Sequence, residues 1–164
     1  DVGGGVFWGN TITMGAGPVA SYCIYTEQPN SIYSHNTCTH YGTRNDSPGI
    51  VVSSYASGTM LVGNLVRMLA GGSNGIDLGA SSVLASQNTV VRTTAPAGHG
   101  LTGGAGRTAW KAHDNIVSGF AVGLSHENSP NYEDKNNSLL FNTIACADHV
   151  GVLRTCDAST MIRR

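Results

Sequence analysis

Four carboxylates are the residues of this sequence best suited to acid–base chemistry: Asp77, Asp114, Glu127 and Asp134. Hydrolysis of a glycosidic bond requires two carboxylates that flank the bond, one as the acid and one as the base or nucleophile. Asp77 stands between Ile76 and Leu78, so the alternation of a strand points it away from a core. Asp77 and Asp114 could share a face, but the sequence alone does not bring them within catalytic reach. These acids are therefore candidate catalytic residues whose pairing the fold must decide.

Two arginines suggest a different chemistry, that of a lyase. Arg67 and Arg92 closely follow Asn64 and Asn88, and a lyase uses Lys or Arg to abstract a proton beside a Ca²⁺-bound uronate. The sequence has no cluster of aspartates at matched positions for such a metal, so the arginines could equally form an exposed basic strip. The six histidines fall in no tight metal-ligand spacing. We predict neither a metal nor a cofactor.

Tyrosines complete the candidate ligand-binding residues, which are Tyr22, Tyr25, Tyr132, Arg67 and Arg92. A tyrosine ring can cover the apolar face of a sugar while its hydroxyl stays hydrogen-bonded. Tyr22 and Tyr25 predict a binding site near the start of the chain or, equally well, a cover for an exposed end. Tyr132 belongs to the polar stretch 126–137 together with Glu127 and Asp134, which is either one wall of a groove or a solvated loop.

The composition limits the classes of fold and partner. The chain has 164 residues, a formal net charge of −1 and 12% charged residues, so it lacks the basic surplus typical of nucleic-acid binding. No apolar run reaches the length of about 18 to 20 residues that spans a bilayer. Glycine accounts for 22 residues, and Leu, Glu and Lys are sparse, which favours strands and tight turns over long helices. We expect a single all-β domain over residues 1–164 with neither a nucleic-acid nor a membrane partner.

The elements that would position these residues recur at a nearly fixed period. An asparagine is followed two positions later by Ile, Val or Cys at intervals of 24 to 28 residues, at Asn10, Asn36, Asn64, Asn88, Asn115 and Asn142. The second residue after each Asn gives an inward-facing column: Ile12, Cys38, Val66, Val90, Val117 and Ile144. Stacked strands lie about 4.8 Å apart, so the Asn amides can form a hydrogen-bonded ladder. The repeat predicts a solenoid of about six coils, each with three short strands, and leaves a β-sandwich as the alternative.

Glycine and cysteine add two further signals. Glycine precedes an aliphatic residue once in each repeat, at Gly49, Gly75, Gly100, Gly123 and Gly151, with Gly17 as a degenerate first copy. The cysteines form an early pair and a late pair, Cys23 with Cys38 and Cys146 with Cys156, which predicts a disulfide near each end and an oxidising compartment. Because Cys38 lies in the inward column, a free thiol packed in the core is the alternative there.

The alternation from Asn64-Leu-Val to Gly75-Ile-Asp-Leu, repeated from Asn142-Thr-Ile to Gly151-Val-Leu, resembles the right-handed parallel β-helix superfamily. That superfamily includes pectate-lyase-like enzymes, polysaccharide epimerases and hydrolases, and bacteriophage tailspikes. The resemblance implies an all-β, right-handed parallel β-helix that engages a polysaccharide or cell-surface glycan along its side. It also implies an extracellular or virion-surface location, and either a homotrimer or part of a larger protein, because the open ends of a β-helix must be covered. The expected function is a carbohydrate-engaging or structural module, with a polysaccharide lyase or glycoside hydrolase as the alternative.

Overall fold

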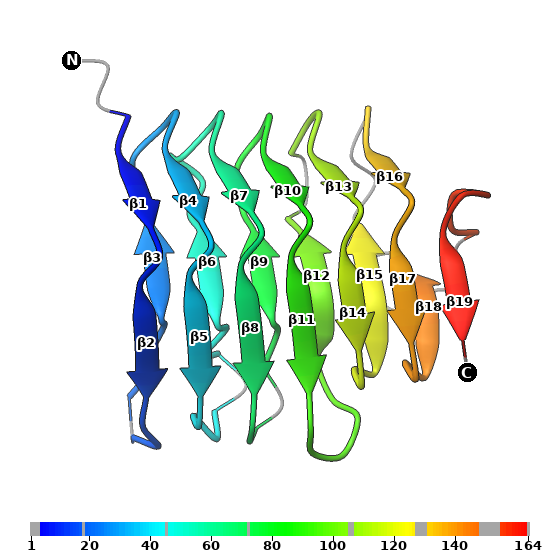
Figure 1. Cartoon of the computed structure of the whole chain (residues 1–164), viewed down its shortest axis with the longest axis horizontal. Coiled ribbons are helices and arrows are strands. Elements are labelled where there is room, and N and C mark those ends of the chain that lie inside the picture. Colours follow the sequence, from blue (N-terminus) through cyan, green and yellow to red (C-terminus); the bar gives the residue numbers. More distant parts are fainter. Residues whose placement is uncertain are drawn as a thin grey trace.

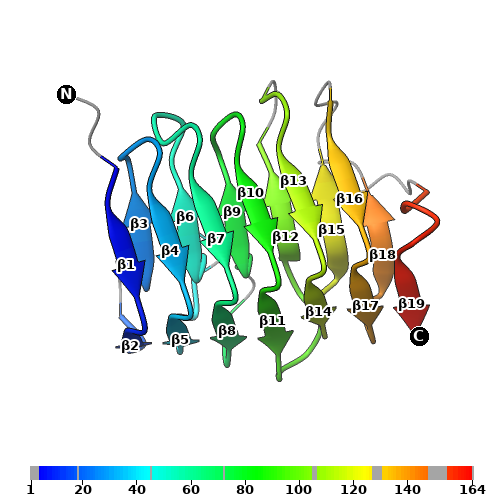
Figure 2. The same cartoon turned by 45° about the horizontal axis from the view of Figure 1, so that its top comes forward.

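The computed structural model describes residues 4–17, 19–44, 46–71, 73–104, 107–126, 131–147 and 155–163. Its strands form three sheets in which every pairing is parallel. Successive coils each add one strand to every sheet, so the strands of a sheet lie side by side along one axis (Figures 1 and 2). The predicted all-β solenoid of about six coils is confirmed. None of the described segments forms a helix long and apolar enough to cross a membrane.

The three sheets are named here in the order in which the first coil visits them. Sheet 1 contains β1 (Val6–Trp8), β4 (Ile32–Ser34), β7 (Met60–Val62), β10 (Leu84–Ser86), β13 (Lys111–His113) and β16 (Glu133–Lys135). Sheet 2 contains β2 (Thr11–Met14), β5 (Thr37–His40), β8 (Leu65–Met68), β11 (Thr89–Arg92), β14 (Ile116–Ser118), β17 (Ser138–Leu140) and β19 (Met161–Arg163). Sheet 3 contains β3 (Ile24–Thr26), β6 (Ile50–Val52), β9 (Ile76–Leu78), β12 (His99–Gly103), β15 (Val122–His126) and β18 (Ile144–Ala147).

The core is a column of apolar side chains that all three sheets enclose. Alternation along each short strand turns one set of residues inward, and the inward residues of sheet 2 include Cys38, Val66, Val90 and Val117. Trp110 and Phe120, both in the C-terminal half, are the largest fully buried side chains of the core. The apolar column is therefore continuous from coil to coil.

An asparagine ladder runs along the corner between sheets 1 and 2. Asn64 donates both its backbone N–H and its Nδ2 to Oδ1 of Asn88, at 3.0 and 2.9 Å. Each Nδ2 group beyond the first coil also donates to a carbonyl of the preceding coil, as Asn88 does to Leu61 O at 2.9 Å. The same pattern links six residues: Asn10, Asn36, Asn64, Asn88, Asn115 and Asn137. The ladder satisfies polar groups that would otherwise be buried without partners.

The residue before each ladder Asn has a positive φ angle. These residues are Gly9, His35, Gly63, Gln87, Asp114 and Asn136, with φ from 52° to 68°. The left-handed conformation turns the chain sharply from sheet 1 into sheet 2, and the N–H of His35, for example, bonds to Val62 O in the next coil at 3.0 Å. The backbone thus adopts the same turn at this corner in every coil.

The prediction that Asn142 is the sixth ladder residue is wrong. Asn137 occupies that place, and Asn142 instead donates to Val117 O and accepts from the N–H of Phe120. Ile144 correspondingly begins β18 in sheet 3, and Leu139 fills the inward column. The last spacing of the ladder is shorter, because Asn137 stands 22 positions after Asn115, whereas the earlier spacings are 24 to 28 positions. An Asn followed two positions later by an apolar residue occurs twice in this part of the sequence, at Asn137 and at Asn142. The regular spacing of the earlier repeats favoured Asn142, but the structure uses Asn137.

The glycine column is present in sheet 3, with two departures from the expected copies. A Cβ on Gly49, Gly75 or Gly100 would lie 2.1 to 2.6 Å from a valine methyl of sheet 2, so only glycine fits. Cys23 rather than Gly17 stands in this column in the first coil, and Ala145 follows Gly123, as the pairings of β3 with β6 and of β15 with β18 show. Gly151 lies outside the described residues.

Both predicted disulfides are confirmed. Cys23 bonds to Cys38 and Cys146 bonds to Cys156, so the described chain has no free thiol. The first bond joins the glycine column of coil 1 to the inward column of coil 2, and the second ties the C-terminal segment to β18. Each bond closes a short loop at one end of the solenoid, which limits the freedom of the unfolded chain.

We expect Asn88→Ala to lower the free energy of unfolding by about 3 kcal/mol or more, because it leaves several buried donors and acceptors unpaired. Asn10→Ala is the matched control. Asn10 is exposed, and among the described residues its Nδ2 bonds only to Asn36 and Trp8, so its loss should be less than half as large. Urea unfolding measures both, and equal losses would contradict the role assigned to the ladder.

Candidate functional site

The outward face of sheet 3 carries two of the residues that the sequence singled out, Tyr25 and Asp77, and Tyr22 lies just before its first strand. Strand pairing places Tyr25, Val51, Asp77, Thr102 and Ser125 in one outward column. Tyr25 is 51% exposed and Asp77 is half-buried, whereas Thr102 and Ser125 are buried. The accessible part of this face therefore lies over β3, β6 and β9. We call it the sheet 3 site, with Tyr22, Tyr25, Glu27, Val51, Ser53 and Asp77 as its residues.

Tyr22 and Tyr25 form an aromatic pair at the start of the site. Their ring centroids lie 5.5 Å apart with a tilt of 33°. The hydroxyl of Tyr25 donates to Oε1 of Glu27 at 2.8 Å, and this bond to a carboxylate is the main cause that raises the pKa of Tyr25. The hydrogen bond holds the Tyr25 ring in place while leaving much of it accessible, an arrangement suited to stacking against a sugar.

The candidate catalytic acids do not form one site. Asp77 faces outward from β9, as predicted, but Asp114 lies at the corner between sheets 1 and 2 with a φ of 56°, so the two acids do not share a face. Asp134 points into the solenoid and is only 7% exposed. Glu127 lies outside the described residues. Asp77, Asp114 and Asp134 thus lack the flanking geometry of a glycosidase pair.

Asp134 is buried, and Tyr132 is partly buried and packs against the core, so neither projects from an exposed loop as the groove wall would require. Tyr132 packs against Trp110 and stacks on His126, with centroids 4.5 and 4.0 Å away. Asp134 accepts the N–H of Asp157 at 3.2 Å, and burial raises the pKa of its carboxyl. The expected polar loop contains strand β16, whose alternation turns its middle residue inward.

Arg67 and Arg92 do not form an exposed strip. Arg67 pairs with Val91 and faces solvent, whereas Arg92 pairs with Met68 and is 4% exposed. The Arg92 guanidinium donates to the carbonyls of residues 71 and 73 and lies over the Phe120 ring, and burial lowers its pKa. The two arginines stand three and four positions after their asparagines, which places them on opposite faces of the strand.

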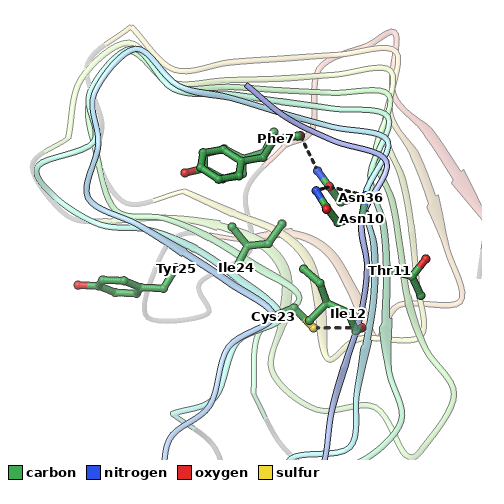
Figure 3. Close-up of a pocket in the computed structure, with 9 residues that line it drawn as sticks. Phe7, Asn10, Thr11, Ile12, Cys23, Ile24, Tyr25 and Asn36 are labelled. Carbon is green, nitrogen blue, oxygen red and sulfur yellow. Dashed lines mark hydrogen bonds between the residues drawn. The ribbon is translucent and has the colours of Figure 1, made fainter. Parts of the chain in front are cut away.

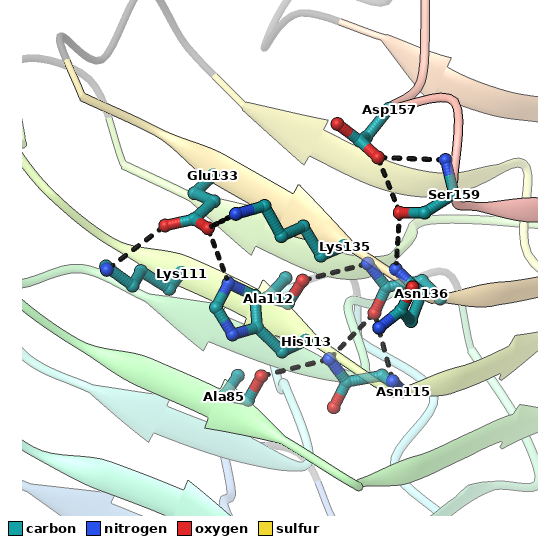
Figure 4. Close-up of polar contacts among 11 residues, drawn as sticks. Ala85, Lys111, Ala112, His113, Asn115, Glu133, Lys135, Asn136, Asp157 and Ser159 are labelled. Atoms are coloured by element: carbon teal, nitrogen blue, oxygen red, sulfur yellow. Dashed lines mark hydrogen bonds and ion pairs between the residues drawn. The ribbon is translucent and has the colours of Figure 1, made fainter.

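A charged cluster on the outward face of sheet 1 was not predicted (Figure 4). Glu133 bonds to Lys135 and lies 3.1 Å from Nζ of Lys111 and 3.5 Å from Nε2 of His113. The hydrogen bonds from Lys135 and then Lys111 lower the pKa of Glu133 to about 2. The sequence contains a signal for this cluster. Lys111-x-His113 in one repeat corresponds to Glu133-x-Lys135 in the next, and parallel pairing of β13 with β16 places the two side by side. The cluster joins two cations through one carboxylate and leaves a basic surplus.

A pocket of about 400 Å³ opens at the N-terminal end of the solenoid (Figure 3). Phe7, Ile12, Ile24 and Tyr33 supply its apolar lining, and Asn10 and Asn36 of the ladder supply polar groups. Tyr25 and Thr11 point away from its interior. No group of His, Cys, Asp and Glu that could hold a metal ion is found within the described ranges.

The adjacent carboxylates Glu133 and Asp134 should affect stability in opposite directions. The folded-state pKa of Asp134 is raised, so the free energy of unfolding falls as the pH rises from about 4 through that pKa. Asp134→Asn should therefore raise Tm at pH 7, since its amide oxygen can still accept the N–H of Asp157. The folded-state pKa of Glu133 is lowered, so Glu133→Gln should lower Tm at pH 7, and the difference should disappear as the pH falls to about 2.

Thermal unfolding between pH 2 and pH 8 measures both effects. A lower Tm for Asp134→Asn at neutral pH would show that its charge is stabilising rather than costly.

Comparison with known proteins supports the fold. No family model matches the chain, and no curated protein matches it. Among solved structures it is similar to the periplasmic alginate epimerase AlgG, with a TM-score of 0.60 and 17% sequence identity. The match covers 97% of this chain and 38% of AlgG, so the chain spans well under half the length of that protein. At this identity the likeness supports the architecture alone, that of a parallel β-helix.

Proposed function

We propose that the chain is a glycan-binding β-helix module that holds a polysaccharide along the sheet 3 site. The observation that carries this proposal is the Tyr22–Tyr25 pair, two partly exposed rings 5.5 Å apart on the outer wall of the solenoid. Aromatic rings stack on the apolar faces of sugars, and the pair is fixed by the bond from Tyr25 to Glu27. The polymer would cross from this platform towards Asp77.

The dimensions of the site suit an extended polymer. Val51 separates Tyr25 from Asp77 in the outward column, so the two residues are two strand spacings apart, about 10 Å. Beside the column, Ser53 and Glu27 follow β6 and β3 and offer hydrogen-bonding groups along the same edge. An aromatic platform with polar groups a short distance away provides both the contact area and the orientation that sugar binding requires.

The similar solved structure and the two disulfides support a carbohydrate ligand and a location outside the cytoplasm. The solved structure with the similar fold is named as a periplasmic alginate epimerase. Two disulfides are typical of proteins from oxidising compartments. We propose an extracellular or periplasmic-type location, while a virion surface and a homotrimer stay predictions from the resemblance.

A panel of acidic and neutral polysaccharides tests the proposal by titration calorimetry. Tyr25→Ala should weaken binding at least about tenfold, equivalent to about 1.4 kcal/mol. Tyr25→Phe should retain most of the affinity because it keeps the ring. Phe141→Ala is the matched control, an aromatic that is 64% exposed but follows β17 near the other end of the solenoid, and it should bind like the wild type.

The same samples test cleavage, the alternative function. Reducing ends report hydrolysis, and ultraviolet absorbance reports the unsaturated products of a lyase. Cleavage by the wild type that is lost in Asp77→Asn would show that the chain is an enzyme, and the proposal of a binding module would be rejected. Equal binding by Tyr25→Ala and the wild type would reject the sheet 3 site.

A further inference from the structure

His40 is a buried histidine at the end of β5, behind the segment that leads into the sheet 3 site. Its side chain is 0% exposed, and strand pairing places Met14 and Met68 beside it. Segment 19–23 runs along the surface and carries Tyr22, one half of the aromatic pair. Histidine is the side chain that ordinarily titrates between about pH 5 and pH 8. A group that can change its charge is therefore buried close to the proposed binding platform.

Both ring nitrogens of His40 bond to the backbone, and these partners determine the tautomer. The N–H of Gly42 donates to Nδ1 at 3.0 Å, so Nδ1 carries no proton. Nε2 consequently carries the proton and donates to the carbonyl of Ser21 at 2.8 Å. The arrangement thus requires a neutral imidazole that is protonated on Nε2.

The bonds to Ser21 hold the chain just before Tyr22. The carbonyl of Ser21 accepts from His40, and its N–H donates to Oγ of the buried Ser47 at 3.2 Å. On the other side of Tyr22, the disulfide of Cys23 fixes the chain to β5. The position of the Tyr22 ring in the aromatic pair hence depends on an anchor that includes His40.

Protonation of Nδ1 is incompatible with this arrangement. It would set two donors, Nδ1–H and the N–H of Gly42, against each other. The ring packs so closely on Gly42 that a Cβ there would overlap Cε1, so it cannot turn towards that side. The imidazolium would also be a buried charge, which is costly without a counterion. The ring gains water when Ser21 and the exposed residues before it move away.

The surroundings of the ring provide no such counterion within the described residues. Met14 and Met68 on the paired strands are neutral. The titratable or charged groups on the adjoining segments are Tyr22, Tyr41, Arg44 and Asp46. Asp46 accepts two hydrogen bonds from Arg44, both at 2.7 Å, and this pairing lowers the pKa of its carboxyl. Asp46 therefore keeps both its charge and its partner in mild acid.

We propose that His40 is a positioning residue for the sheet 3 site and makes that site responsive to pH. The neutral ring holds Tyr22 in the aromatic pair through its bond to Ser21. In mild acid the protonated ring releases this segment, while the disulfide of Cys23 keeps the rest of the coil in place. The inference rests on the proposed glycan-binding function, and it implies that a glycan bound near neutral pH is released in acid.

Amide hydrogen exchange in the wild type tests the switch without any glycan. The N–H groups of Ser21 and Gly42 are protected only while the segment is closed. Their protection factors, corrected for intrinsic exchange, should fall at least about tenfold from about pH 7.5 to about pH 5. The N–H of Asn88, which bonds within the ladder, is the internal control and should stay protected. Unchanged protection of Ser21 in acid would overturn the proposal, and so would an equal loss at Asn88.

Two substitutions separate the two bonds of the ring. His40→Gln can still donate to the Ser21 carbonyl but does not titrate. His40→Asn can accept from the N–H of Gly42 but is too short to reach Ser21. Glu27 and Asp77 are unchanged in both variants, so any pH dependence that comes from these carboxylates remains. The difference between the wild type and His40→Gln therefore isolates the contribution of the imidazole.

Calorimetric titration with a polysaccharide that the wild type binds measures the effect of each variant. The wild-type affinity should fall at least about tenfold from about pH 7.5 to about pH 5. His40→Gln should match the wild type at neutral pH and lose most of this dependence. His40→Asn should bind at least about tenfold more weakly already at neutral pH.

Two results of the titration would overturn the proposal. The first is an equal pH dependence in the wild type and His40→Gln, which would assign the effect to other groups. The second is wild-type affinity in His40→Asn, which would show that the bond to Ser21 does not position Tyr22. If no polysaccharide binds at either pH, the glycan-binding function is rejected, whereas exchange at Ser21 and Gly42 still decides whether the switch exists.

Discussion

The structure depends on the hydrogen bonds of the asparagine ladder at the corner between sheets 1 and 2. A solenoid must turn at the same place in every coil, and each turn leaves backbone groups that cannot bond within a strand. Asn solves this problem because its amide both donates and accepts, so one residue type can bond to its own copy in the next coil. The positive φ of the preceding residue supplies the turn, and the amide supplies the bonds.

With the corner fixed, the alternation of the strands decides what each residue can do. β16 illustrates this: Glu133 and Lys135 lie on the outer surface, while Asp134 between them lies inside. The same rule separates Arg67 from Arg92. Neighbouring residues therefore have opposite environments and oppositely shifted pKa values, as Glu133 and Asp134 do. Chemistry on this scaffold is restricted to outward columns and corners.

The parallel stacking also explains how sites arise on such a regular molecule. Residues about 25 positions apart become neighbours at one strand spacing, so Tyr25 and Asp77 share a column although 52 residues separate them in sequence. Lys111 and Glu133 meet in the same way. The outward face of sheet 3 is accessible over β3, β6 and β9, because Thr102 of β12 and Ser125 of β15 are buried.

The sequence by itself determined the repeat, the all-β solenoid, five of the six ladder residues and the disulfide pairs, because each depends on residue type at a regular interval. Tertiary structure alone decided the last coil, where Asn137 rather than Asn142 joins the ladder. It also decided which polar residues reach the surface, since a shift of one position reverses the face of a strand. Asp134 and Arg92 were expected outside and lie inside, and Tyr132 packs partly buried against the core. The cluster around Glu133 emerged only when the register of β13 and β16 was known. The spacing of the repeat predicts the scaffold because every coil repeats the same strands and turns. A site depends on which residues of neighbouring coils are paired, and that register cannot be read from the spacing where the coils differ in length.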